Sequence, residues 1–106
     1  MTKYVINLLQ VPNQEVSCNL EKSDGSFMAV DIRLRTLPDN MLIADITINN
    51  EVQRLSAAVH NNMPLIPTNI VGGNIYFTDI HGDTDPQYGE FNERYQLIYD
   101  SEYQLY

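Results

Sequence analysis

Acidic residues and one histidine gather in a short stretch late in the chain, where they could bind a metal ion: Asp79, His81, Asp83, Asp85 and Glu90. Hard cations such as Ca²⁺ take several oxygen ligands from one loop, so this density of carboxylates suggests a calcium site. The spacing argues against it. An EF-hand loop that starts at Asp79 places Glu90 at its twelfth position but Thr84 at the position that requires glycine.

The second possible register of that loop fails as well. A loop that starts at Asp83 has Tyr88 at the glycine position and Arg94 at the twelfth. We therefore predict no metal and no other cofactor. The favoured interpretation is a solvated loop in which Asp83 and Asp85 accept hydrogen bonds in turns and caps.

Covalent catalysis would need a nucleophile, a base and an orienting group close together. The candidates are Cys18, His60 and His81, which lie far apart in the sequence and carry no local signature of a nucleophile. We interpret Cys18 as a core residue, His60 as the end of a strand and His81 as a loop residue. The sequence predicts a protein that is not an enzyme.

The chain has an excess of acidic residues, 14 against 6 basic, which gives a net charge of −8. From Asp79 onward, seven acidic residues face Arg94 alone. Nucleic-acid binding depends on basic surfaces that neutralise phosphates, so we predict no DNA or RNA partner. An acidic surface instead suits solubility or contact with a basic protein partner.

The expected compartment follows from the short apolar runs and the single thiol of the chain. Residues 1–7 lack the apolar run of a secretory signal, and the longest apolar runs are too short to cross a bilayer. A single cysteine is compatible with a reducing compartment. We expect synthesis in a cytoplasm and no membrane association.

Apolar residues recur at every second position in most of the chain. Glu15 to Glu21 has every even residue apolar and every odd residue polar, which is typical of a strand with one face on a core. The pattern predicts an all-β antiparallel sandwich or partly open barrel. About eight strands are expected, at residues 3–9, 14–21, 27–36, 41–49, 51–60, 64–70, 74–80 and 94–99.

Turn residues separate these runs. Asn49-Asn50 predicts a two-residue hairpin loop, because asparagine tolerates positive φ. One short helical turn is expected near 86–92, with Asp85 as its cap and Pro86 at its first position. Residues 1–106 form one predicted domain, in which 100–106 is a flexible or docking tail.

Other side chains suggest contacts with a second subunit. Arg33 and Arg35 lie two residues apart on the polar face of one strand, where they either pair with acids such as Asp31 or Asp45 or meet a partner. Tyr103 and Tyr106 lie beyond the last predicted strand, which is typical of a docking tail or of a frayed end.

The order and spacing of several short motifs resemble one bacteriophage family over nearly the whole chain. The earlier motifs are Val11-Pro12-Asn13-Gln14, Ile32-Arg33-Leu34-Arg35 and Asp45-Ile46. The more specific ones are Asn74-Ile75-Tyr76-Phe77-Thr78-Asp79, Asp85-Pro86-Gln87-Tyr88, Phe91, Arg94-Tyr95 and Leu97-Ile98-Tyr99. Together they are similar to the baseplate plug proteins of contractile-tailed phages, of which a cyanophage baseplate plug is an example.

The resemblance implies a small structural subunit of the virion, made in the host cytoplasm and placed at the distal end of the tail tube. Tube, hub and spike proteins would be its partners, and several copies would associate to close or line the channel. Candidate interface residues are Arg33, Arg35, Asp83, Asp85, Tyr88, Phe91, Tyr103 and Tyr106. We expect the two arginines of one subunit to meet Asp83 and Asp85 of the next.

Two alternatives stay open at this point. The acidic loop and the tyrosines would also suit a carbohydrate-binding or calcium-dependent module on a β-sandwich. A small hydrolase or isomerase in a β-barrel would require His60, His81 and several acids to converge.

Overall fold

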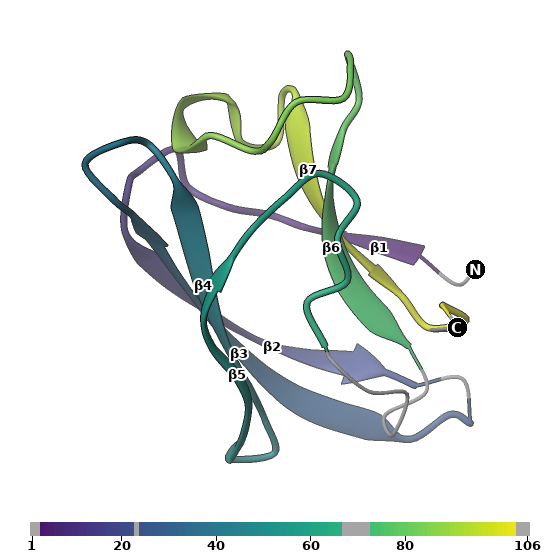
Figure 1. The fold of residues 1–106 in the computed structure, drawn as a ribbon. Coiled ribbons are helices and arrows are strands. Elements are labelled where there is room, and N and C mark those ends of the chain that lie inside the picture. The colour runs from purple at the N-terminus through teal and green to yellow at the C-terminus, as the bar shows by residue number, and fades with distance from the viewer. Residues whose placement is uncertain (1–2, 23, 67–72, 104–106) are drawn as a thin grey trace.

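Two antiparallel sheets face each other in the computed structural model, which describes residues 3–22, 24–66 and 73–103 (Figure 1). One sheet has four strands in the order β2-β3-β4-β5, and the other has three in the order β1-β7-β6. The strands are β1 (Lys3–Ile6), β2 (Gln14–Glu21), β3 (Phe27–Thr36), β4 (Leu42–Ile48), β5 (Glu51–Ala58), β6 (Asn74–Asp79) and β7 (Tyr95–Asp100). The predicted all-β sandwich is confirmed, and the two sheets do not close into a barrel.

The described residues contain seven strands where the sequence predicts about eight. Residues 64–66 of the predicted strand 64–70 are not a strand, and 67–70 lie outside the described residues. Leu65 N–H donates to the Ile75 carbonyl at 2.8 Å. At Ile66 the hydrogen-bond partner is the buried side chain of Asn74 and not the backbone of a strand. Asn74 Oδ1 accepts from Ile66 N–H and Asn74 Nδ2 donates to the Ile66 carbonyl, both at 2.8 Å. The segment therefore lies against β6 without forming a ladder.

The two-residue hairpin between β4 and β5 is confirmed. Asn49 and Asn50 have φ of 51° and 67°, the left-handed values that this tight turn needs. Asn49 also bonds to Ala29 on β3 through both its backbone N–H (2.8 Å) and its side-chain Oδ1 (2.9 Å). The turn is therefore joined to the neighbouring hairpin as well.

The predicted helical turn is a single 3₁₀ turn at Tyr88–Glu90. Its expected cap is wrong. Gln87 precedes the turn and makes no side-chain capping bond, while both Asp85 oxygens bond to residues 60 and 61 on another segment. The Asp85 carboxylate therefore bonds to the His60 imidazole and the Asn61 N–H and does not cap the 3₁₀ turn.

The core lies between the inner faces of the two sheets. On β3 the even-numbered residues from Met28 to Leu34 are at most 1% exposed, and on β6 and β7 the side chains of Ile75, Phe77, Leu97 and Tyr99 are 0% exposed. Each such apolar side chain stabilises the fold by about 1.5–3 kcal/mol. The alternation seen in the sequence therefore corresponds to the inner and outer faces.

Candidate functional site

The loop between β6 and β7 is organised around one buried ion pair. Asp79, the last residue of β6, has a fully buried side chain, and Arg94 lies directly before β7. Arg94 Nε donates to Asp79 Oδ1 and Arg94 Nη2 to Asp79 Oδ2, both at 2.9 Å. This two-point contact fixes the planes of both groups, as is usual for strong arginine–carboxylate pairs.

The same carboxylate also holds the first part of the loop. Asp79 Oδ1 accepts from His81 N–H at 2.9 Å, and Oδ2 accepts from the N–H and hydroxyl of Thr84, each at 3.0 Å. The bonds from Arg94, His81 and Thr84 favour the charged form, so they hold the pKa of Asp79 well below its usual range. Both Asp79 oxygens are therefore engaged by the protein itself.

A second carboxylate joins this loop to the segment after β5. Asp85 Oδ2 lies 3.0 Å from His60 Nδ1, and Asp85 Oδ1 accepts from Asn61 N–H at 3.0 Å. The contact with His60, followed by the Asn61 N–H, lowers the pKa of Asp85. Asn61 Oδ1 in turn accepts from Asp79 N–H at 2.8 Å, so the two carboxylates are parts of one network.

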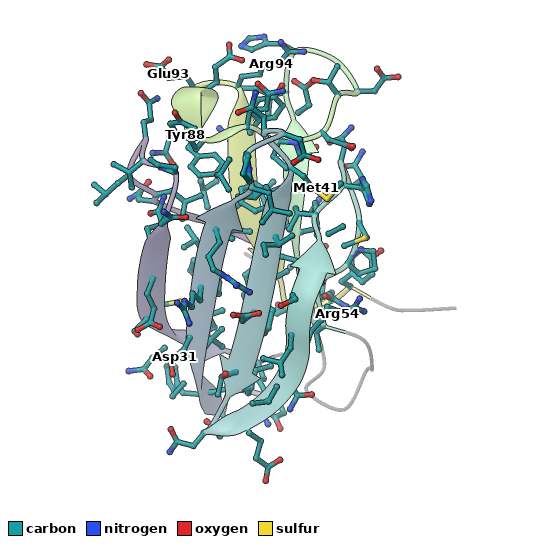
Figure 2. The ribbon with its side chains drawn as sticks, turned by 60° about the vertical axis from the view of Figure 1, so that its left-hand side comes forward. Asp31, Met41, Arg54, Tyr88, Glu93 and Arg94 are labelled. Atoms are coloured by element: carbon teal, nitrogen blue, oxygen red, sulfur yellow. The ribbon has the colours of Figure 1, made fainter. Side chains whose placement is uncertain are left out.

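The sequence interpretation of this loop is partly corrected by these contacts. It assigned the backbone contacts to Asp83 and Asp85, whereas Asp79 makes most of them and Asp83 is exposed. Within residues 3–22, 24–66 and 73–103, no three His, Cys, Asp or Glu side chains gather as metal ligands. What the loop presents to solvent is negative charge, at Asp83, Glu90 and Glu93 (Figure 2 labels Glu93).

Arg35 is bound by other residues of the same chain. Its Nη2 lies 3.3 Å from both oxygens of Asp45 and donates to Ser56 Oγ at 3.0 Å. Asp45 Oδ1 also accepts from Ser56 N–H. Ser56 has φ of 50° and lies where the pairing of β4 with β5 shifts register. Arg35 and Asp45 thus stabilise a bulge in the edge strand β5.

Arg33 has a different environment from Arg35. It is exposed on the outer face of the four-stranded sheet, in register between Glu15 on β2 and Asp45 on β4. No hydrogen bond or ion pair of its side chain occurs among the described residues. Of the two arginines, Arg33 therefore retains a free cationic group.

The aromatic candidates fall in three environments. Phe91 is 0% exposed and stacks on Phe77 with ring centroids 5.5 Å apart, so its ring belongs to the core and is not presented to a partner. Tyr88 is half-buried against the core at the same end of the sandwich as Glu93 and Arg94 (Figure 2). The ring of Tyr103 packs against the ring of Tyr76 with centroids 5.7 Å apart, and Tyr106 lies outside the described residues.

A groove of about 380 Å³ was not anticipated from the sequence. It opens between β1 and β2, the edge strands on one side of the sandwich, and its lining includes Tyr4, Val16, Cys18 and Phe27. Cys18 faces the core, as predicted, but is only half-buried. Burial, with the nearby charge of Asp31, raises the pKa of its thiol.

Sequence reasoning missed the ion pair of Asp79 and Arg94. The available indication was that Arg94 is the single basic residue after Asp79 and is the first residue of the strand predicted at 94–99. Recognising the pair also required knowing that β6 and β7 are antiparallel neighbours, with Asp79 opposite Tyr95.

Residues 3–102 match the model of the family described as "Cyanophage baseplate Pam3 plug gp18". No curated protein matches the chain. None of the helical segments in the described residues is long and apolar enough to cross a membrane.

Proposed function

The chain belongs to the cyanophage baseplate plug family, and we propose that it acts at the end of the phage tail tube by associating with copies of itself and with hub and tube proteins. The observation that carries this proposal is the family match across residues 3–102, nearly the full length. The family is a structural one and not a class of enzyme. Membership implies a role in the phage baseplate, among other tail proteins in the virion.

The charge distribution supports contact through the loop after β6. The exposed acids there belong to a loop that Asp79 and Arg94 hold in place, so the backbone that carries them is ordered before binding. A loop that is ordered before binding loses less conformational entropy when a partner binds. A basic surface on a neighbouring protein would complement this end of the sandwich.

Contacts within the chain leave fewer candidate residues for the proposed contact between copies. Arg35 and Asp85 have partners within the chain, whereas Arg33 and Asp83 are exposed and have none among the described residues. We therefore place the contact between Arg33 of one copy and Asp83 of the next. A closed ring repeats one such contact around its circumference, so that each copy contributes Arg33 to the contact with one neighbour and Asp83 to the contact with the other.

Charge reversal tests this contact. Arg33→Glu and Asp83→Arg should each reduce incorporation of the chain into phage particles, and the double variant should restore it. Melting temperatures of the purified variants should stay close to wild type, because both sites are exposed. The contact is wrong if the double variant assembles no better than the two single variants.

A further inference from the structure

The two sheets differ in width, and the difference leaves one side of the sandwich uncovered. Three strands lie opposite four. Beside β5 and β6 the residues after β5 cross between the sheets, since Val59 N–H bonds to Leu42 on β4 and Leu65 N–H to Ile75 on β6. On the opposite side, β1 and β2 border the opening (Figure 1). This opening contains the groove of about 380 Å³.

The groove is apolar although it opens to solvent. Val16 and Cys18 are only half-buried, whereas the corresponding inward residues of β3 are at most 1% exposed. Tyr4 is 43% exposed and Phe27 66% exposed. Exposed apolar surface that is continuous with a core is typical of an interaction site.

Both borders of the groove are strand edges with unused backbone groups. β1 is the last strand of its sheet and β2 the last of the other, and within the described residues neither has a backbone partner on its outer edge. The Tyr99 hydroxyl donates to the carbonyl of Glu21, a lining residue, at 3.0 Å and so links the two sheets beside the groove. An extended segment that pairs with the free edge of β1 would lie over the groove and cover Val16 and Cys18.

The negative charge of the groove and of the whole chain indicates which segment would bind there. Among the described residues that line the groove, Glu21 is the only charged one, and the chain carries a net charge of −8. A second copy of the chain would bring another −8 to this site. A segment with lysine or arginine next to its apolar residues is complementary instead.

We propose that the groove binds an extended, basic segment of another tail protein, which adds a strand to the edge of β1. Side chains at alternate positions of the segment are apolar and pack on Tyr4, Val16 and Cys18. Its lysine or arginine lies near Glu21. This inference rests on the proposed function, because it names a surface for the contact with neighbouring tail proteins.

Photocrosslinking in assembled phage particles tests the occupant. Phe27→p-benzoylphenylalanine places the probe at the groove, and Leu55→p-benzoylphenylalanine is a matched control on β5, since the two wild-type side chains are 66% and 67% exposed. After irradiation, mass spectrometry of the Phe27 variant should identify an alternately apolar, lysine- or arginine-containing segment of a different tail protein. The Leu55 variant should not crosslink to that segment.

Two results of the crosslinking would overturn the inference. One is a crosslink from the Phe27 variant to a second copy of the chain or to an acidic segment. The other is no crosslink at this position in particles that contain the variant.

Alkylation of Cys18 in unmodified particles provides a second measurement if the probe prevents assembly. N-ethylmaleimide should react about tenfold more slowly in particles than with the isolated chain if about 90% of the grooves are occupied, because only the free fraction reacts. Equal rates in particles that contain the chain contradict the groove and leave the proposed function standing. Absence of the wild-type chain from particles contradicts the proposed function itself.

Discussion

The Asp79 carboxylate accepts five hydrogen bonds, two from Arg94 and the others from His81 and Thr84, although its side chain is fully buried. A buried charge without such partners is costly, so each bond counts toward keeping the loop in one conformation. The acid that first suggests metal binding is therefore the residue that positions the acidic surface.

Asp79 should make the stability of the protein depend on pH in the acid range. Its folded-state pKa is depressed, chiefly by Arg94, so its contribution is complete above the unfolded value of about 3.9 and is lost as pH falls through the lower folded value. Urea unfolding between pH 7 and pH 2 should therefore show a smaller loss of stability in Asp79→Asn than in wild type.

Asp83→Asn is the matched control for that experiment, since Asp83 is an exposed acid of the same loop. Its unfolding free energy should follow the wild-type dependence on pH. Parallel curves for wild type and Asp79→Asn would show that the ion pair does not stabilise the folded state.

The environment of Phe91 predicts a stability effect where the sequence suggested an interface. Phe91→Ala removes a fully buried ring that stacks on Phe77 and should lower the free energy of unfolding by about 3–5 kcal/mol. Phe27→Ala, at a position 66% exposed, should change it by no more than about 0.5 kcal/mol. Chemical denaturation of both variants measures the difference. Equal losses would place Phe91 outside the core.

Among the secondary-structure elements, the hairpin of β4 and β5 turns through two consecutive residues with positive φ, Asn49 and Asn50. Asn50 has φ of 67°, a value that glycine adopts freely and a β-branched residue avoids. Asn50→Val should therefore destabilise the protein by about 1–2 kcal/mol, while Asn50→Gly should be close to neutral. Thermal unfolding of the two variants compares the same exposed site. Identical melting temperatures would contradict the positive φ.

The strands that could be predicted are those in which apolar and polar residues alternate in the sequence. β2, β3 and β4 each have one apolar face, so period two defines both the strand and the side that faces the core. The hairpin at Asn49 and Asn50 followed from turn chemistry, since both neighbouring strands were already defined.

What could not be predicted depends on contacts between segments far apart in sequence. The bulge at Ser56 requires Asp45 and Arg35, which lie 11 and 21 residues away. Asn74 binds the backbone of Ile66 through its side chain, so residues 64–66 run along β6 without a regular ladder. The groove arises from the unequal widths of the two sheets, a property of strand order that alternation does not reveal.

At the scale of the whole molecule, the sandwich presents three distinct surfaces. One end carries the acidic loop, the outer face of the four-stranded sheet carries Arg33, and the side between β1 and β2 carries the apolar groove. The contacts that we propose for these surfaces would suit a place among other tail proteins. The family match over residues 3–102 assigns that place to the phage baseplate.

We propose that the chain is a structural part of the baseplate at the end of the tail tube. Electron cryomicroscopy of particles that contain the chain and of particles from a deletion phage tests it most directly. We predict density that fits the two-sheet sandwich at the distal end of the tube in the first and an unfilled site there in the second. Identical density at that site in both kinds of particle would show that the chain does not occupy this position.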